Sequence, residues 1–472
     1  MREPHSAAAP GVIVVGAGIA GLTAAYRLAR LRPDIGVRVI EAGHHLGGWI
    51  RSERRDGFLL EHGPDTFLAR KPGGMALCHE LGLDECLIPT LPQPQKAFIV
   101  RGGTLHPLPE GMSGLVPGRL GPLLASRLLS VRGRLRVGAE PFVPRWNAPG
   151  MDEETVAGFI RRRFGDEAYR WLFEPLLCGI VAGDGEVLSV AGVAPRLLEL
   201  ESRYGSVLRG VRRTRTAPDA GGPTGFVSFR DGMGTLPGTL EAAMPGVQVM
   251  RGRRVTAIRP LSDTGWEVAI EGSTSEAAAV VLAVPAWVAA PLVEAWQPSL
   301  SRALAGIDFA STATVSLGFS RLPADPALRG YGYLVPTAEP DGGPVLACSW
   351  SSSKLPGRAP ADGFLLRVFL GRGETSGTDA DLVSIARAEV GDRLGIDREP
   401  LLSVVSRHER AMPQFTLGYR ERRETIDRLA AMVPGLALAG ASYDGIGLPD
   451  GIRSGEGAAR IVVEYLDLRR AA

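Results

Sequence analysis

Lysine is nearly absent from this chain of 472 residues, because only Lys71, Lys96 and Lys354 among its 53 basic residues are lysine. We attribute the bias toward arginine to genomic base composition, and any mechanism that needs a lysine has only these three positions. The formal net charge is +2, and no basic run alternates with aromatic residues. The chain therefore lacks the charge pattern of a nucleic-acid-binding protein, and we expect no nucleic-acid partner.

Cysteine is also sparse and is not arranged for metal binding. Four cysteines are scattered along the chain: Cys78, Cys86, Cys178 and Cys348. They form no CxxC pair, which argues against a disulfide framework and against a zinc site. His44 and His45 are adjacent but have no further ligand at metal-binding spacing, so no metal is predicted.

Long apolar runs are lacking too. No segment approaches the roughly eighteen uninterrupted apolar residues that a membrane span needs. The stretch before Gly11 has no apolar core of signal-peptide length. We therefore expect a reduced, cytoplasmic protein without a transmembrane segment.

A buried strand followed directly by a glycine motif is the strongest signal in the chain. The strand spans 12–15, and the motif has the spacing GxGxxG: Gly16, Ala17, Gly18, Ile19, Ala20 and Gly21. The three glycines permit, in turn, a tight turn, close approach of a pyrophosphate and close helix packing. A second apolar strand ends at Glu41, whose carboxylate can accept both hydroxyls of a ribose. The pattern predicts a dinucleotide site, with NAD and FAD both open.

Three further glycine-containing segments favour FAD over NAD. Gly47-Gly48 and Gly63-Pro64 follow the second strand, and residues 440–455 combine a glycine-rich loop with the start of the last helix. Each segment alone suits an ordinary turn. Together they suit a cofactor that extends past its pyrophosphate and is contacted from both ends of the chain, with a helix start facing it.

The segment 119–137 is predicted to be an amphipathic and strongly basic helix. Its apolar residues are Leu120, Leu123, Leu124, Leu128 and Leu135. Three interpretations remain open: core packing with a solvated arginine face, peripheral attachment to anionic lipid, or a basic wall for an anionic substrate.

Strands return after a long helical stretch, which predicts a discontinuous domain. We expect an α/β fold in which 1–95, 225–300 and 415–472 form a Rossmann-type FAD-binding domain. A mainly helical insertion covers 96–208, a linker covers 209–224, and a mixed-sheet substrate domain covers 301–414. Within these parts we expect one strand over 248–258, pairing of 266–270 with 276–282, strands over 309–319, 346–350, 364–370 and 401–408, and a helix over 379–394.

Six blocks in this order resemble the porphyrinogen oxidases of haem synthesis, over nearly the whole chain: LGGWIRS, EHGPDTFLARK, TLHPLPEG, FEPLLCGIVAGD, MPQFTLGY and AGASYDGIGLPDGIRSG. The resemblance implies non-covalent FAD, a glutathione-reductase-like nucleotide domain, a substrate domain and a helical domain. It also implies an oxidoreductase that acts on CH–CH groups. Such an enzyme removes six electrons from a porphyrinogen in three flavin cycles, with oxygen as acceptor and hydrogen peroxide as by-product.

The resemblance also implies which residues contact FAD. They are Gly16 to Gly21 at the pyrophosphate, Glu41 and Ala42 at the adenosine, Trp49, Gly63, Pro64, Asp65 and Thr66 beside the cofactor, and Val255, Ala441, Ile446, Gly447 and Leu448. No catalytic acid or base is assigned, because the substrate is electron-rich and its product aromatic. His408 stands where many relatives carry tryptophan, so no flavin contact is assigned there.

Two branches of the family differ in substrate. GPDTFLARK, FIRRRFGDE, ACSWSSSKLPG and GIGLPD resemble the soluble enzymes that act on coproporphyrinogen III. Ala97 also stands where protoporphyrinogen enzymes, which are often membrane-bound, commonly place a substrate-pairing arginine, whereas the Trp-Ile of LGGWIRS resembles that second branch. We predict oxidation of coproporphyrinogen III to coproporphyrin III, with protoporphyrinogen IX as the alternative substrate.

Two rival functions and several partners follow from the same resemblance. Flavin amine oxidases and desaturases share the nucleotide fold, but amine oxidases usually hold a lysine on the strand matching 310–319, which has none here. A flavoprotein that binds porphyrin without turnover is the non-enzymatic rival. The expected partners are a porphyrinogen, oxygen and a ferrochelatase that takes over the product, with peripheral membrane contact if segment 119–137 binds lipid. The oligomeric state is not predicted.

Overall fold

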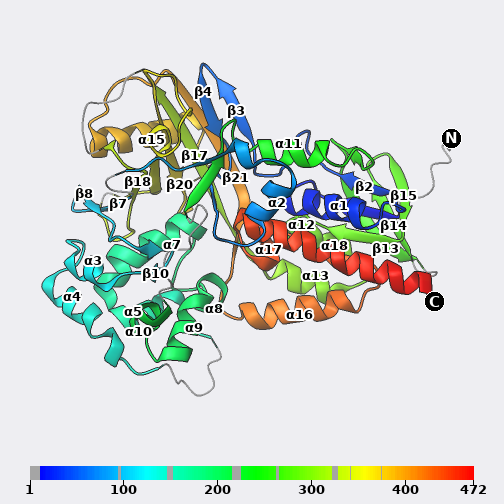
Figure 1. Ribbon diagram of the computed structural model, residues 1–472, viewed down its shortest axis with the longest axis horizontal. Helices are drawn as coiled ribbons and strands as arrows, with labels where there is room; N and C mark the ends of the chain where they lie inside the picture. Colours follow the sequence, from blue (N-terminus) through cyan, green and yellow to red (C-terminus); the bar gives the residue numbers. More distant parts are fainter. Residues whose placement is uncertain are drawn as a thin grey trace.

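The computed structural model describes residues 11–93, 97–145, 153–214, 225–261, 265–320, 328–340, 342–373 and 375–471. Lys96 and residues 215–224 of the expected linker lie outside the described residues. The molecule is elongated, with a parallel sheet toward one end and a group of helices at the other (Figure 1). Among the described residues, no helix is long and apolar enough to cross a membrane.

The parallel sheet has five strands in the order β12-β2-β1-β16-β22. They are β1 (Val12–Val15), β2 (Val37–Ile40), β12 (Gln248–Met250), β16 (Ala279–Leu282) and β22 (Leu436–Leu438). All four residues of β1 are buried, as expected of a central strand covered on both faces. The sheet joins three separate stretches of sequence, which confirms the predicted α/β fold class.

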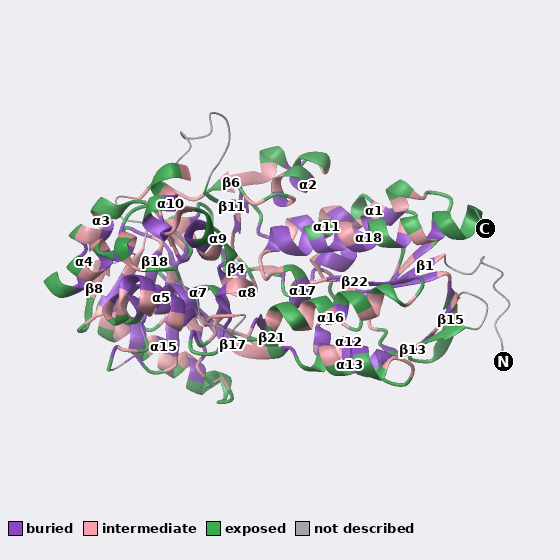
Figure 2. Ribbon diagram, turned by 90° about the horizontal axis from the view of Figure 1, so that it is seen from below, coloured by how far each residue is buried: buried purple, intermediate pink, exposed green. Residues whose placement is uncertain are grey.

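Helices cover one face of this sheet, and α1 (Ile19–Leu31) and α18 (Leu448–Ala471) lie side by side there (Figure 1). A Cβ added to Gly455 of α18 would lie 2.2 Å from the Ala20 carbonyl oxygen, so the two backbones touch. α11 (Thr235–Ala242) packs on α1, and Figure 2 shows buried residues where α11 and α18 meet the rest of this layer. The opposite face carries α12 (Ala286–Val293), α13 (Pro298–Ala305) and a three-stranded sheet.

The three-stranded sheet corrects two expectations about residues 248–282. It consists of β13 (Val255–Leu261), β14 (Gly265–Ile270) and β15 (Ser273–Ala277). The single strand expected over 248–258 is wrong: Gly252 has a φ of +64° and turns the chain between β12 and β13. The pairing of 266–270 with 276–282 is wrong beyond Ala277, because the continuous apolar run of β16 is buried beside β1 instead.

A mixed sheet of seven strands has the order β21-β17-β20-β19-β18-β7-β8, with only β18 and β7 parallel. Its strands are β17 (Asp308–Phe319), β18 (Gly332–Leu334), β19 (Val345–Trp350), β20 (Phe364–Leu370), β21 (Leu402–Gln414), β7 (Phe98–Arg101) and β8 (Thr104–Pro107). α15 (Asp379–Leu394) packs against β17 and β21 and begins with a capping box of Thr378 and Asp381. The predicted strands and helix of this region are confirmed, although β21 continues to Gln414.

β7 and β8 lie in the segment 96–208, which was expected to be mainly helical. Ile99 and Val100 are fully buried in the sheet, and the turn between the strands uses Gly102 and Gly103 at positive φ. Apolar β-branched residues followed by a glycine pair are typical of a hairpin. We propose that residues 98–107 belong with the substrate-side sheet and that the helical part begins after them.

The helical part is built from short helices around its own core. They are α3 (Leu120–Ala125), α4 (Val131–Gly138), α5 (Val156–Phe164), α6 (Asp166–Ala168), a π-helical turn (Tyr169–Phe173), α7 (Glu174–Val181), α8 (Val190–Val193), α9 (Pro195–Tyr204) and α10 (Val207–Thr214). The single helix expected over 119–137 is wrong, because the chain breaks after Ala125 and restarts at Ser130, which caps α4. Residues 209–214, expected as linker, complete α10.

Short elements connect these parts. They are β3 (Ser52–Arg55), β4 (Phe58–Glu61), β5 (Phe67–Leu68), α2 (Gly74–Glu80), a 3₁₀ turn (Asp84–Cys86), β6 (Leu87–Pro89), β9 (Met112–Ser113), β10 (Val116–Pro117), a 3₁₀ turn (Glu140–Phe142), β11 (Phe226–Phe229), α14 (Ser351–Lys354), α16 (Tyr419–Ala431) and α17 (Ala441–Asp444).

Candidate cofactor-binding site

The glycine motif lies between β1 and α1. Two of its glycines pack tightly against neighbouring backbone atoms, and the third faces open space. A Cβ added to Gly16, whose φ is +96°, would lie 2.7 Å from the Ala283 carbonyl oxygen, and one added to Gly21 would lie 2.0 Å from the Gly16 carbonyl oxygen. A Cβ added to Gly18 would meet no atom within 4 Å. Gly18 also precedes α1 without a side-chain cap, so free N–H groups face this open space. The shape fits a pyrophosphate lying on the backbone.

Glu41 holds the backbone beside the glycine motif in place. Its Oε2 accepts the backbone N–H of Ala17 at 2.8 Å, and its Oε1 accepts that of Gly43 at 2.7 Å. A carboxylate has about four acceptor positions, so it can still receive two ribose hydroxyls. The backbone of Glu41 also pairs with Met250 and Arg253, which places the start of β13 with Val255, and Ala42, at this same end.

The segment 47–49 continues the site from the glycine motif toward residues 63–66. Gly47 N–H donates to the Ala17 carbonyl at 2.8 Å, and a Cβ added to Gly48 would lie 3.2 Å from the Gly18 Cα. Trp49 is 45% exposed, and its ring meets the His408 ring edge-on at 5.2 Å. A Cβ added to Gly63 would lie 1.7 Å from the Trp49 carbonyl oxygen, so the loop of residues 62–66 is in backbone contact with this segment.

The C-terminal glycine-rich loop meets the same place from the other end of the chain. Ala441 begins α17, Ile446 and Gly447 follow it, and Leu448 begins α18. A Cβ added to Gly451 would lie 2.8 Å from the Ile19 Cγ2 atom, so the N-terminal ends of α1 and α18 lie together. Two positive helix ends at one point favour an anionic group there.

The structure thus places the sequence-predicted residues in one connected strip. Contacts run from Glu41 through the glycine motif and residues 47–49 to residues 63–66, and the 441–448 loop joins the strip at Ile19. The strip fits an extended dinucleotide whose pyrophosphate lies at Gly18.

Two lysines are part of this site although sequence reasoning missed them. Lys71 forms an ion pair with the buried carboxylate of Asp450, which also accepts the Gly447 N–H at 3.1 Å. Lys354 Nζ lies 2.9 Å from both carboxylate oxygens of Asp65. Both described lysines therefore hold an aspartate of a predicted cofactor loop. Their scarcity was the signal that could have drawn attention to them.

A buried charged cluster lies beneath the loop of residues 62–66. Glu61 accepts the Ser52 hydroxyl at 2.6 Å and the Met233 N–H at 2.9 Å, and burial raises the pKa of its carboxyl to about 7. Arg358 and Arg367 line a small cavity beside Glu61, and the Nε atoms of both arginines have no protein partner. The cavity has room for about one water molecule, which could satisfy these groups.

His408 is a neutral ring at this site. Burial, with a further contribution from the Arg367 charge, lowers the pKa of its imidazole to about 4. At neutral pH it therefore packs against Trp49 without carrying a proton to donate as an acid.

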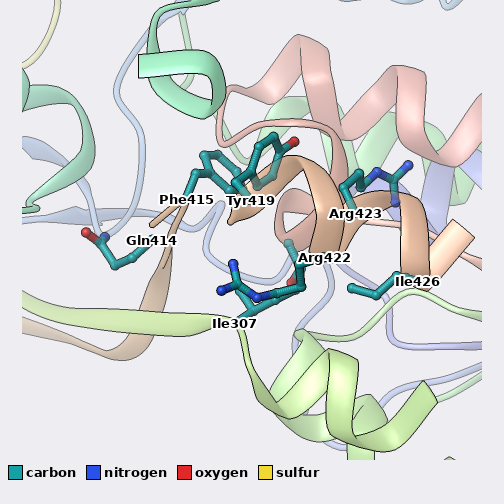
Figure 3. A pocket seen from close by; sticks show the side chains of 8 residues that line it. Ile307, Gln414, Phe415, Tyr419, Arg422, Arg423 and Ile426 are labelled. Carbon is teal, nitrogen blue, oxygen red and sulfur yellow. The ribbon is translucent and has the colours of Figure 1, made fainter. Parts of the chain in front are cut away.

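A second hollow lies at the junction of β21 and α16 (Figure 3). Apolar side chains of Ile307, Phe415 and Ile426 line it, with Tyr419 and two arginines at its edge. It contains none of the predicted cofactor residues and touches α17 only through Ser442. We therefore do not assign it to the cofactor.

Most of the chain is similar in sequence to a family of flavin-containing enzymes and to individual oxidases. The family described as flavin containing amine oxidoreductase matches residues 19–463. Coproporphyrinogen III oxidase of Bacillus subtilis (strain 168) is 30% identical over 475 residues, which cover 96% of this chain and 98% of the relative. Protoporphyrinogen oxidase of Bos taurus is 33% identical over 493 residues, with coverage of 96% and 98%. A crystal structure of a protein from Exiguobacterium sp. 255-15 matches with a TM-score of 0.83 and 30% identity, covering 97% of this chain and 98% of that one.

Proposed function

Because the chain belongs to the family of flavin-containing amine oxidoreductases, we propose that it oxidises a porphyrinogen to a porphyrin, with coproporphyrinogen III as substrate and oxygen as electron acceptor. The chain is an oxidoreductase, and FAD is its cofactor. One observation carries the proposal: the likeness to the coproporphyrinogen III oxidase of B. subtilis covers 96% of this chain, so it includes the cofactor strip and the seven-stranded sheet.

Each part of FAD has a proposed place along the cofactor strip. We propose that Gly18 and the starts of α1 and α18 hold the pyrophosphate, that Glu41 and Ala42 with Val255 hold the adenosine end, and that Trp49 and residues 63–66 lie beside the ring. When bound, FAD accepts hydride from a bridging carbon of the porphyrinogen. Orientation of the two reactants is then the main contribution of the protein.

No side chain of the described site is arranged as a strong base. The carboxyl of Glu61 is buried against Ser52 and Met233, and the ring of His408 is neutral. The oxidised macrocycle is aromatic and the porphyrinogen electron-rich, so loss of a pyrrole proton needs no strongly basic residue. The residues that supply orientation, rather than an acid–base pair, should therefore determine the rate.

The substrate assignment rests on the names of the relatives and on the sequence blocks. The bacterial relative is named coproporphyrinogen III oxidase and the mammalian relative protoporphyrinogen oxidase, at similar identity. Coproporphyrinogen III carries more propionates than protoporphyrinogen IX. This difference favours coproporphyrinogen III for a chain rich in arginine, because guanidinium groups pair carboxylates bidentately.

The test is aerobic incubation of the purified yellow protein with coproporphyrinogen III and, separately, protoporphyrinogen IX. Porphyrin fluorescence and hydrogen peroxide should both rise, faster with coproporphyrinogen III. No rise with either substrate contradicts the proposal, and faster turnover of protoporphyrinogen IX reverses the substrate assignment.

Amine oxidation is the second candidate, because the matching family is described by that activity. β17 contains no lysine, and the two described lysines are engaged by Asp65 and Asp450. We therefore expect no peroxide from primary amines in the same assay. Peroxide formed with an amine and not with a porphyrinogen would favour this candidate, whereas porphyrin binding without peroxide would favour a non-catalytic flavoprotein.

We also propose that α4 and the turn after it contact an anionic lipid surface. Val131, Leu135 and Phe142 are 71%, 70% and 82% exposed, so Leu135 does not pack into the core as one of the three interpretations of segment 119–137 requires. Arg132 lies on α4 beside them, and α4 is at the end of the molecule remote from α18 (Figure 1). Exposed large apolar side chains among arginines are typical of an interfacial helix.

Vesicle co-sedimentation tests the lipid proposal. Leu135→Ser with Phe142→Ser, and separately Arg132→Glu, should abolish binding to anionic vesicles without raising the KM in solution. Leu468→Ser on α18, where the side chain is 73% exposed, is the matched control and should change nothing. A raised KM without loss of vesicle binding would assign this surface to the substrate instead. A ferrochelatase remains a proposed recipient of the product, testable by transfer of coproporphyrin between the two proteins.

A further inference from the structure

The loop of residues 62–66, between β4 and β5, is held by side chains of the seven-stranded sheet. Arg367 of β20 donates from Nη2 to the His62 carbonyl oxygen at 3.1 Å. Ser406 of β21 lies with its Oγ 2.8 Å from His62 Nδ1. This loop is in contact with Trp49, so the substrate-side sheet and the cofactor strip meet here.

Lys354 makes the strongest of these attachments. It is the last residue of α14, which follows β19 of the seven-stranded sheet. Its Nζ lies 2.9 Å from Asp65 Oδ1, 2.9 Å from Asp65 Oδ2 and 3.2 Å from Thr66 Oγ1. The two Asp65 oxygens face the ammonium together as one carboxylate, and Thr66 Oγ1 accepts a further N–H beside them.

The geometry gives a reason for lysine at this position in a chain that otherwise uses arginine. An ammonium is a compact charge, so one Nζ atom contacts both Asp65 oxygens and Thr66 Oγ1, whereas a guanidinium is planar and spreads its donors over three nitrogens. Arginine at position 354 would still pair the Asp65 carboxylate through its fork, but it would place its charge at a different position from that of the Lys354 ammonium.

The pair is shielded from solvent, which strengthens it. The side chains of Lys354 and Asp65 are 14% and 15% exposed. Burial opposes ionisation of Asp65, yet the charges of Lys354 and Arg367 lower the pKa of its carboxyl to about 2. Removal of the ammonium would leave a largely buried carboxylate without its main partner, and such a group tends to move toward solvent or toward another cation.

We propose that Lys354 is a positioning residue for FAD, which holds Asp65 and Thr66 and thereby fixes the cofactor loop to the sheet on the substrate side. This inference deepens the proposed function and rests on it for the placement of the flavin ring beside residues 63–66. Lys354 does not touch the reacting atoms in this account. It acts through the backbone position of residues 63–66.

The test measures the dissociation constant of FAD by fluorescence and the visible circular dichroism of bound FAD. Lys354→Met should weaken FAD binding at least tenfold and change the dichroism spectrum. Lys354→Arg keeps the charge but not the compact position of the ammonium, and should show changes of the same kind in a protein that folds.

Leu382→Ala is the matched control for general destabilisation. Leu382 is 1% exposed in α15 and belongs to the hydrophobic cluster of the same sheet, which includes no residue of the loop. This variant should lower the melting temperature of the apoprotein and leave both FAD readouts at wild-type values.

Wild-type FAD affinity and dichroism in both Lys354 variants would overturn the inference, as would an equal loss of affinity in Leu382→Ala. Neither readout uses a porphyrinogen. Failure of the wild-type protein to oxidise a porphyrinogen would therefore contradict the proposed function. It would not change the outcome of this test of Lys354.

Discussion

Glu41 holds Ala17: the carboxylate at the end of β2 accepts the N–H of the second residue of the glycine motif at 2.8 Å. The same side chain accepts the Gly43 N–H at 2.7 Å, so one carboxylate joins two strand ends of the parallel sheet. This arrangement preforms the end of the site that we propose for the adenosine and leaves acceptor positions for a ribose.

Removal of this carboxylate should weaken FAD binding without unfolding the protein. Glu41→Ala deletes the acceptor for two backbone N–H groups and for the ribose, and a hydrogen bond to a charged group contributes about 1.5–3 kcal/mol. We expect a rise of at least tenfold in the FAD dissociation constant by fluorescence titration, with a smaller rise for Glu41→Gln, which keeps an acceptor. Equal affinity in the wild type and Glu41→Ala would show that Glu41 is not at the adenosine.

Two glycines of the motif should respond to alanine in opposite ways. Gly18→Ala adds a methyl group to open space, so thermal stability should stay near that of the wild type while FAD binding falls sharply. Gly21→Ala places a Cβ 2.0 Å from the Gly16 carbonyl oxygen, and overpacking of this kind costs about 1–3 kcal/mol in the free energy of unfolding. Thermal melts of the apoproteins and FAD titrations separate the two effects. Unchanged FAD affinity in Gly18→Ala would contradict the proposal that the pyrophosphate binds at Gly18.

Glu61 should make the folded protein less stable as pH rises. Burial raises the pKa of its carboxyl from 4.5 to about 7. Between these two pH values the folded state therefore keeps a proton that the unfolded state has lost. The stabilising contribution is complete below pH 4.5 and is lost by about pH 7, with a magnitude on the order of 3 kcal/mol.

Chemical denaturation at pH 5 and pH 8 checks this prediction. The difference in the free energy of unfolding between the two pH values should be smaller in Glu61→Gln than in the wild type, because glutamine has no proton to lose. An identical difference in both proteins would assign the pH dependence to other groups.

His408 should not contribute a proton transfer near neutral pH. Burial and the Arg367 charge lower the pKa of its ring to about 4, so the ring stays neutral through the usual assay range. The profile of kcat/KM between pH 6 and 8 should have the same shape in the wild type and in His408→Phe, which keeps an aromatic contact with Trp49. A step near pH 6.5 that disappears in the variant would give His408 an acid–base role.

Local signals were enough to predict the parallel sheet and much of α15 and β17. Strand, glycine motif, helix and acidic residue follow one another within 11–41, so the chemistry of this unit is visible in a single stretch. The capping residues Thr378 and Asp381 similarly mark the start of α15.

Features that depend on distant partners were not predicted. β7 and β8 are strands because an edge of the seven-stranded sheet is available to them, and segment 119–137 divides at Ser130, whose N–H and hydroxyl both donate to the distant Glu167. Lys354 and Asp65 are 289 positions apart, so no local pattern could pair them. Only the low number of lysines gave a sequence signal for that contact.

The most direct test of the central claim is the ratio of hydrogen peroxide to porphyrin formed aerobically from coproporphyrinogen III. Removal of six electrons in three two-electron cycles with oxygen as acceptor predicts three molecules of peroxide for each coproporphyrin, at a rate well above spontaneous oxidation. Porphyrin formation no faster than in protein-free buffer, or peroxide formation without porphyrin, would contradict the assignment.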